Sequence, residues 1–281
     1  MSLPLQLAVQ KSGRIGDESL DFLRACGLAF KTSPRGLRAV CNTFPLELLF
    51  LRSKDIPEIV ADGGADLGIC GEDVLAERGG NHLRVIESLG FGQCRLSIAA
   101  PGPLELNGAR IATSFPNALR QYLDGQGVSA DIIMLSGSVE IAPGLGIADA
   151  ICDLVSTGST LTENGLVELH EVLRSETVLF GSGSLSPEKQ DLADRLVLRV
   201  RSRLAAQRTR YIVMNAPRAS VARIRELLPG LKTPTVSELA DPGWVSIATV
   251  VGVDVFWETM HALREAGATG ILVMPIEQLI Q

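Results

Sequence analysis

Residues 137–161 read GSVEIAPGLGIADAICDLVSTGSTL, and this stretch decides how the rest of the chain is interpreted. Its apolar run Ala150–Val155 is short and bounded by turn residues, which is typical of a buried strand. The loop that follows consists of Ser156, Thr157, Gly158, Ser159 and Thr160. Its hydroxyl groups, its glycine and its free backbone N–H groups at the start of a predicted helix can bind a phosphate.

Two acids accompany this loop. Asp153 lies just before it, near the end of the strand, and Glu140 lies near the start of the quoted stretch. A carboxylate repels a phosphate, but it accepts hydrogen bonds from the hydroxyl groups of a sugar. An acid, a buried strand and a phosphate loop in this order therefore favour a sugar phosphate over a bare anion. Two simpler interpretations stay open, because residues 157–160 can be a turn with a helix cap and Asp153 can be a solvated strand end.

Composition limits the other possibilities. With 281 residues the chain can form one to three domains with a sizeable core. A net charge of −6 disfavours general binding to nucleic acid or to an anionic membrane, so an anionic substrate requires a local cationic pocket. No apolar run is long enough to span a membrane and no signal peptide is recognisable. The five cysteines include no close pair, so we expect reduced thiols in a cytoplasmic protein.

Cationic side chains follow two of the predicted strands in the first part of the chain. Lys11 and Arg14 follow the first strand, and Arg52 follows the strand over residues 46–51. Open α/β sheets bind ligands at the carboxyl ends of their strands, and guanidinium groups match phosphate oxygens. The alternatives are a solvated basic turn and, for Arg52, a surface salt bridge with Asp55.

The order of the predicted elements indicates the domain organisation. Strand, polar turn and helix recur, which predicts βαβ units and a largely parallel sheet. The break at Pro101-Gly102-Pro103 indicates a hinge, after which a second compact unit carries residues 137–161. We therefore expect one lobe over residues 1–100 with 175–208, and a second lobe over residues 101–174.

The C-terminal part, residues 209–281, follows a different pattern. Its elements are predicted in the order strand, helix, strand, strand, helix, strand, which is the ferredoxin-like βαββαβ unit. Small modules of this kind often add a binding surface without adding chemistry. Thr235 and Ser237 lie in one of its strands, where ordinary polar strand positions would explain them.

Motifs along the whole chain resemble those of one family, the ATP phosphoribosyltransferases. One set lies in the central stretch: Glu140, Gly146, Ala148, Ile151, Asp153-Leu154, Thr157-Gly158 and Thr160-Leu161. Others are Gln10-Lys11-Ser12-Gly13-Arg14, Asp66-Leu67-Gly68-Ile69 with Gly71-Glu72, Cys94-Arg95-Leu96-Ser97 and Phe256-Trp257-Glu258-Thr259-Met260. Because the resemblance runs nearly end to end, it is to the long form of the family, which has a C-terminal regulatory domain.

The resemblance implies a fold and a reaction. The fold is a two-lobed α/β core, similar to a periplasmic solute-binding protein, plus the ferredoxin-like domain. The reaction joins N1 of ATP to C1 of phosphoribosyl diphosphate and releases diphosphate, as the first step of histidine biosynthesis. Histidine is the implied inhibitor, and the implied assembly is a homo-oligomer of dimers that form a hexamer.

The resemblance also implies roles for single residues. Lys11, Arg14 and Arg52 are the implied catalytic cations for the diphosphate, and Glu72 is implied to orient the adenine of ATP. The phosphoribosyl group is assigned to Glu140, Asp153, Ser156, Thr157, Gly158, Ser159 and Thr160. Thr235 and Ser237 are assigned to histidine. Mg²⁺ is expected to arrive with the diphosphate, without a confident protein ligand.

Two other functions remain as alternatives. The first is a bilobed solute-binding protein without catalysis, which the missing export signal and the third domain disfavour. The second is a phosphoribosyltransferase of the common fold that uses another base. Those enzymes carry two adjacent acids before the phosphate loop, whereas here Asp153 is followed by Leu154-Val155.

Overall fold

The computed structural model describes residues 4–33, 35–79, 82–228 and 233–280, except for the side chains of residues 255 and 256. The chain divides into two compact units, Met1–Val197 and Leu198–Gln281, and each is described by itself. The division falls inside the long helix α6 (Pro187–Gln207), whereas the sequence placed the start of the last domain at residue 209.

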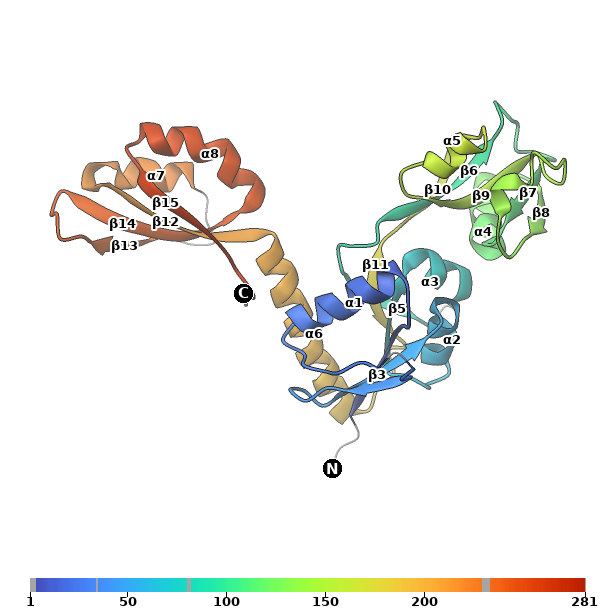
Figure 1. Ribbon diagram of the computed structural model, residues 1–281, viewed down its shortest axis with the longest axis horizontal. Helices are drawn as coiled ribbons and strands as arrows, with labels where there is room; N and C mark the ends of the chain where they lie inside the picture. The colour runs from blue at the N-terminus through green and yellow to red at the C-terminus, as the bar shows by residue number, and fades with distance from the viewer. Residues whose placement is uncertain (1–3, 34, 80–81, 229–232, 281) are drawn as a thin grey trace. The chain divides into compact units, whose positions relative to one another are not determined.

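The first unit contains two sheets (Figure 1). The first sheet has the order β2-β3-β1-β4-β11-β5. Its strands are β1 (Leu5–Gln10), β2 (Arg38–Val40), β3 (Leu46–Leu51), β4 (Leu67–Gly71), β5 (Arg84–Ser88) and β11 (Thr177–Gly181). The central strands β3, β1 and β4 are parallel, as the repeated strand–turn–helix pattern predicted. The strand β4 is buried along its whole length, as expected for a parallel strand covered on both faces.

Short helices connect these strands and place polar residues at their carboxyl ends. They are α1 (Arg14–Ala25), the 3₁₀ turn η1 (Ser53–Asp55), α2 (Ile56–Ala61) and α3 (Glu72–Arg78). The helices α1 and α3 begin at Arg14 and Glu72, so both of these residues lie in the first turn of a helix.

The second sheet has the order β10-β6-β9-β7-β8. Its strands are β6 (Cys94–Ala100), β7 (Arg110–Thr113), β8 (Asp131–Met134), β9 (Ala150–Val155) and β10 (Val167–Ser175). Its helical segments are α4 (Pro116–Gln126), the 3₁₀ turn η2 (Val139–Ile141) and α5 (Ser159–Glu163). Because β6 pairs with β9 and β10, the chain changes sheets before Cys94. The sequence therefore placed the boundary between the lobes, at Pro101-Gly102-Pro103, later in the chain than the structure does.

The strand predicted from the opening stretch is confirmed as β9, with the expected bounds. Alternate residues of β9 point to opposite faces. Ala150 and Cys152 join the core beneath α4, while Ile151 and Val155 join the core on the other face, beside η2 and α5. The sheet is therefore covered on both faces, and the loop after β9 is anchored from both sides.

The second unit has the predicted βαββαβ order. Its strands are β12 (Thr209–Pro217), β13 (Thr235–Glu238), β14 (Trp244–Gly252) and β15 (Thr269–Pro275), with η3 (Arg218–Ser220), α7 (Val221–Leu227) and α8 (Val253–Glu265). The order β13-β14-β12-β15, with antiparallel pairing throughout, is the ferredoxin-like arrangement. The predicted fold class, a two-lobed α/β core followed by a separate C-terminal sheet domain, is confirmed.

Candidate active site

The residues predicted to bind the sugar and its phosphate line one pocket of the second lobe. Its volume is about 160 Å³. Its walls include Glu140, Asp153, Ser156, Thr157, Gly158, Ser159 and Thr160. Glu140 comes from η2, Asp153 from β9 and the others from the β9–α5 connection. The fold thus brings into one cavity an acid and a loop that lie up to 20 positions apart in the sequence.

The loop after β9 turns sharply at Gly158, whose φ of 84° lies in the left-handed region that favours glycine. The hydroxyl groups of Thr157 and Ser159 lie 3.2 Å apart at its rim. The helix that follows, α5, has only five residues, so its macrodipole is small. Attraction for an anion must therefore come from the hydroxyl and backbone N–H groups of the loop itself.

The two acids of this pocket influence each other. Burial raises the pKa of Asp153, and the carboxylate of Glu140 adds to that rise because two negative charges repel. A 2.8 Å hydrogen bond from the N–H of Leu154 to Asp153 Oδ1 opposes the rise. Two neighbouring carboxylates in a partly buried pocket are suited to accept hydrogen bonds from adjacent sugar hydroxyl groups.

A bidentate ion pair fixes the segment that leads from η2 to β9. Arg110 Nη2 and Nε donate to the two oxygens of Asp149 at 2.7 and 3.2 Å. Arg110 Nη1 also donates to the carbonyl of Gly146 at 3.2 Å. Hydrogen bonding and charge from Arg110 lower the pKa of Asp149, so this pair stays ionised at neutral pH. The turn that carries Glu140 is thereby tied to the start of β7.

The predicted cations lie at the carboxyl edge of the first sheet. Gln10 and Leu51 are register partners on the parallel strands β1 and β3, so the next residues, Lys11 and Arg52, leave the sheet at the same edge. The N–H of Lys11 donates to the carbonyl of Leu51 at 2.9 Å. Both cations are exposed, and the part of the chain that the structure describes contains no ion pair between Arg52 and Asp55. Their side chains are available to an anion.

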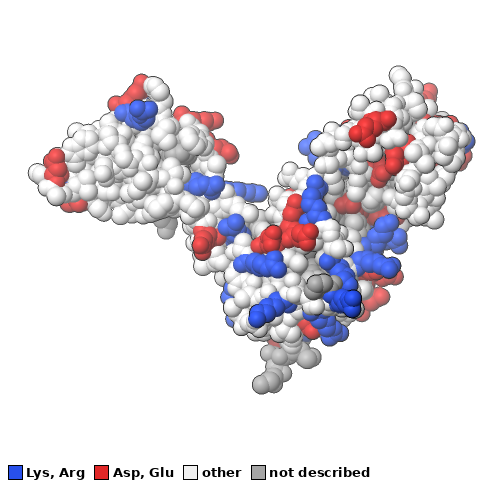
Figure 2. Space-filling model, in the orientation of Figure 1, with Lys and Arg blue, Asp and Glu red and all other residues white. Residues whose placement is uncertain are grey.

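Basic side chains are concentrated on the first lobe. Figure 2 shows them clustered over the surface that carries α1 and β3, although the whole chain is acidic. Within this surface, Lys11 and Arg52 supply the cations at the carboxyl edge of the first sheet.

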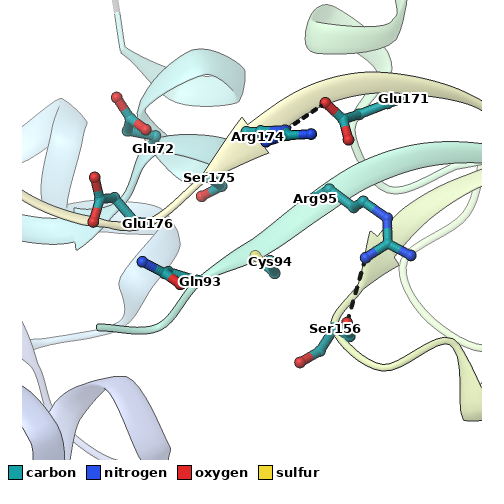
Figure 3. Close-up of a pocket in the computed structure, with 9 residues that line it drawn as sticks. All are labelled: Glu72, Gln93, Cys94, Arg95, Ser156, Glu171, Arg174, Ser175 and Glu176. Atoms are coloured by element: carbon teal, nitrogen blue, oxygen red, sulfur yellow. Dashed lines mark hydrogen bonds and ion pairs between the residues drawn. The ribbon is translucent and has the colours of Figure 1, made fainter. Parts of the chain in front are cut away.

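Glu72 lies in a second, larger pocket of about 630 Å³. Figure 3 shows its lining, which consists of Glu72, Gln93, Cys94, Arg95, Ser156, Glu171, Arg174, Ser175 and Glu176. Burial raises the pKa of Glu72, and the charges of Glu176 and Asp73 add to the rise. Ser156 lines both pockets, so the loop after β9 also contributes to the wall of the larger pocket.

Arg14 lies beside the larger pocket. Burial and the carboxylate of Asp73 raise the pKa of the Cys94 thiol, and the charge of Arg14 partly offsets this rise. The five cysteines are present as thiols, as expected, and burial raises the pKa of Cys152 to about 12. Cys94 is only half-buried, but its raised pKa makes it a poor nucleophile at neutral pH.

Sequence reasoning missed an arginine that lines the larger pocket. Arg95, in β6, donates from Nε and Nη2 to Glu168 at 2.6 Å each, and from Nη1 to the carbonyl of Ser156 at 3.4 Å. The hydroxyl of Ser97 donates to the same carboxylate at 2.8 Å. The motif Cys94-Arg95-Leu96-Ser97 contained Arg95, but its partner lies 73 positions further along the chain.

The remaining predicted residues, Thr235 and Ser237, belong to the second unit. They pair with Ala248 and Ser246 of β14, alternating with the pair of Val236 and Ile247. Ile247 packs beneath α7 and α8, so Thr235 and Ser237 point to the other face of the sheet, where both are exposed. They lie on the one face of this sheet that α7 and α8 leave uncovered.

Comparison with known proteins supports one family along the chain. A family model described as ATP phosphoribosyltransferase (HisG) matches residues 52–202, and one described as the HisG C-terminal domain matches residues 206–278. An ATP phosphoribosyltransferase of Cytophaga hutchinsonii is 48% identical over 100% of both chains. That of Phocaeicola vulgatus is 44% identical over 98% of this chain and 99% of its own.

A solved structure agrees with these matches. It is described as the ATP phosphoribosyl transferase (HisG:HisZ) complex from Thermotoga maritima. The similarity has a TM-score of 0.62 at 30% identity and covers 70% of this chain and 96% of that chain.

The two-lobed α/β core and these matches define an enzyme of the pentosyltransferase class. The chain belongs to the ATP phosphoribosyltransferase family, whose reaction is the first step of histidine biosynthesis and whose substrates are ATP and phosphoribosyl diphosphate. In the part of the chain that the structure describes, no helix is long and apolar enough to cross a membrane.

Proposed function

We propose that this chain transfers the phosphoribosyl group from phosphoribosyl diphosphate to N1 of ATP, using two pockets that share Ser156 in their linings. One observation carries the proposal: Glu140, Asp153 and the loop 156–160 line one cavity, and Ser156 of that loop also lines the Glu72 pocket. The loop binds the 5-phosphate, the two carboxylates accept hydrogen bonds from the ribose hydroxyl groups, and Glu72 orients adenine.

The cations of the first lobe act on the leaving group. As the bond from C1 to diphosphate breaks, C1 gains oxocarbenium character and negative charge grows on the departing oxygens. Lys11 and Arg52, which leave the first sheet at one edge, and Arg14, in the first turn of α1, stabilise that charge with their cationic groups. N1 of adenine is a modest nucleophile, so its placement against C1 contributes more than a general base, and no base is assigned.

We propose that Mg²⁺ enters the site bound to the diphosphate of the substrate. The described residues contain no group of three or more His, Cys, Asp or Glu side chains able to hold a metal ion. Mg²⁺ prefers oxygen ligands and needs few from the protein, so in this proposal the diphosphate and water supply most of them. The ion would neutralise part of the charge on the leaving group.

The C-terminal unit is proposed to bind histidine as a feedback inhibitor. Thr235 and Ser237 offer two hydroxyl groups, two strand positions apart, on the uncovered face of its sheet. We further propose that the enzyme works in the cytoplasm as a homo-oligomer in which dimers assemble into a hexamer. A relative from Thermotoga maritima is itself described as part of a complex.

A single spectroscopic assay tests both the reaction and its inhibition by histidine. ATP, phosphoribosyl diphosphate, Mg²⁺ and the protein are mixed, and the absorbance of the adenine is followed with and without histidine. Alkylation of N1 changes the adenine spectrum, so a time-dependent change that requires both substrates is expected, and histidine should slow it. A solute-binding protein without catalysis would bind the substrates and leave the spectrum constant, which would refute the proposed function.

A further inference from the structure

A buried glutamate of the first lobe caps a helix of the second lobe. Glu77 lies in the last turn of α3 and is only 8% exposed. Its Oε2 atom accepts hydrogen bonds from the backbone N–H groups of Asn117 and Ala118, at 2.9 and 3.0 Å. The side-chain amide of Asn117 donates back to the carbonyl of Glu77 at 3.0 Å. Three hydrogen bonds therefore join α3 to the first turn of α4.

These bonds replace a cap that α4 lacks in its own sequence. The residue before α4 is Phe115, which has no side-chain group able to accept a hydrogen bond, and Pro116 follows it. The first N–H groups of a helix have no partner within the helix and need one elsewhere. A carboxylate is the favoured partner there because it also faces the positive end of the helix dipole. Here the partner comes from 40 positions earlier in the chain and from the other lobe.

The opposite end of α3 is also fixed, beside the larger pocket. Asp73 is 4% exposed, and its Oδ1 accepts a 2.6 Å hydrogen bond from the hydroxyl of Ser175, at the end of β10. The same hydroxyl accepts the backbone N–H of Asp73 at 3.0 Å. The adjacent residue, Glu72, lines the pocket. One short helix thus touches the pocket at its start and holds the second lobe at its end.

We propose that Glu77 is a positioning residue that aligns the sugar-phosphate pocket of the second lobe with the cations of the first lobe. The inference rests on the proposed function, in which one substrate has its 5-phosphate on the loop 156–160 and its diphosphate beside Lys11 and Arg52. Catalysis then depends on the position of one lobe relative to the other, whereas binding of the 5-phosphate end depends on the second lobe alone. A misplacement of about 1 Å can lower a rate by about 100-fold.

Three variants separate this role from a charge effect and from simple stabilisation. Glu77→Gln keeps a carbonyl oxygen at the same reach, so its kcat should stay close to that of the wild type. Glu77→Asp keeps the charge but is one methylene shorter, and Glu77→Ala removes the acceptor. Both should lower kcat, the alanine variant by about 10- to 100-fold. The dissociation constant for ribose 5-phosphate, measured by calorimetry, should remain unchanged in all three variants.

Hydrogen exchange gives a readout that does not depend on activity. The amides of the first turn of α4 should exchange faster in Glu77→Ala and Glu77→Asp than in the wild type and in Glu77→Gln. Unchanged kcat in Glu77→Ala would overturn the inference. A larger loss in Glu77→Gln than in Glu77→Asp would assign the effect to charge and overturn it as well. Equal losses of kcat and of ribose 5-phosphate affinity would reduce Glu77 to a structural support of the second lobe.

The two proposals fail in different ways. If the wild-type protein forms no product, the proposed function fails, while the exchange experiment still tests whether Glu77 holds the first turn of α4. If the wild-type protein is active and Glu77→Ala is equally active, only the positioning role fails. If the alanine variant does not fold, the comparison of Glu77→Asp with Glu77→Gln decides the matter.

Discussion

The guanidinium of Arg95 donates two 2.6 Å hydrogen bonds to the carboxylate of Glu168 on the neighbouring strand. Its remaining nitrogen reaches the carbonyl of Ser156, the residue that both pockets share. Glu168 therefore fixes the orientation of an arginine that lines the larger pocket and contacts the residue shared by both linings. Held in this way, Arg95 keeps its positive charge beside the position proposed for the substrate.

Glu168→Gln is expected to lower kcat/KM by about tenfold, because a hydrogen bond to a charged group contributes about 1.5–3 kcal/mol and its loss frees the guanidinium to rotate. Steady-state kinetics with both substrates measures this change. Glu105→Gln, an exposed site in the same lobe, serves as the matched control. If both variants retain the wild-type kcat/KM, the orientation of Arg95 has no part in the reaction.

The same pair predicts how stability depends on pH. Hydrogen bonding from Arg95 lowers the pKa of Glu168 below its ordinary value. A carboxyl whose pKa is lowered by folding stabilises the protein above its unfolded pKa, and this contribution is lost as the pH falls through the lowered value. The difference in melting temperature between wild type and Glu168→Gln should therefore be constant near neutral pH and shrink in acid.

Asp153→Asn should separate function from stability. Loss of the charged acceptor is expected to lower kcat/KM for phosphoribosyl diphosphate by about 10- to 100-fold. Burial raises the pKa of Asp153, so its ionised form opposes folding, and removal of the charge should raise the melting temperature at neutral pH. That gain should begin to shrink as the pH falls through the raised pKa, and it should vanish only below the pKa of the unfolded chain, where the carboxyl is neutral in both states.

Kinetics and thermal unfolding check this prediction together. Asp131→Asn, at the exposed start of β8, is the control for both measurements. If Asp153→Asn has the wild-type turnover and the wild-type KM for phosphoribosyl diphosphate, then Asp153 does not bind the ribose. If its melting temperature falls instead, the carboxylate is making a stabilising interaction and the raised pKa is incorrect.

Local sequence was sufficient to predict an element when its own order of apolar and polar residues shows that it is buried and where it ends. The strand Ala150–Val155 was predicted with its observed bounds because its apolar run is flanked by polar turns. Arg38–Val40 and Arg84–Ser88 were missed, since one is very short and the other is partly exposed without regular alternation. Both are edge strands of the first sheet, and their pairing partners lie elsewhere in the chain.

Long-range pairing explains the misplaced lobe boundary and the residues that the sequence did not single out. Pro101-Gly102-Pro103 breaks the chain locally, yet sheet membership of β6 is decided by its partners β9 and β10. The cations at the ends of strands could be foreseen, because parallel strands deliver their carboxyl ends to one edge. The roles of Arg95 and Glu77 could not be foreseen, because their hydrogen-bond partners, Glu168 and the first turn of α4, are distant in sequence.

Arg52→Ala tests whether the carboxyl edge of the first sheet holds the leaving group. Arg52 is exposed beside Lys11 and is not paired with Asp55 among the described residues, so its charge is available to the diphosphate. We expect kcat to fall by about 100-fold, as when one charge-stabilising group is removed from an active site. Inhibition by the product diphosphate should weaken in parallel.

Lys54→Ala is the control for Arg52→Ala, because Lys54 is exposed in the same turn and has no assigned role. It should leave both kcat and diphosphate inhibition unchanged. Equal losses of kcat in the two variants would indicate that the overall positive charge of the lobe matters and not the position of Arg52. An unchanged kcat in Arg52→Ala would show that Arg52 does not contact the leaving group.

Thr235→Val and Ser237→Ala test the proposed histidine site. Both hydroxyl groups lie on the uncovered face of the C-terminal sheet, and each substitution removes a hydrogen-bonding group with little change of shape. We expect the inhibition constant for histidine to rise by about tenfold for each, since one hydrogen bond contributes about 1 kcal/mol and one to a charged ligand contributes more. The rate without histidine should not change, because these residues lie outside the catalytic unit.

Val236→Ala, on the opposite face of the same strand, is the control and should leave inhibition by histidine intact. A rise of the inhibition constant for Val236→Ala alone would place histidine on the helix-covered side of the sheet.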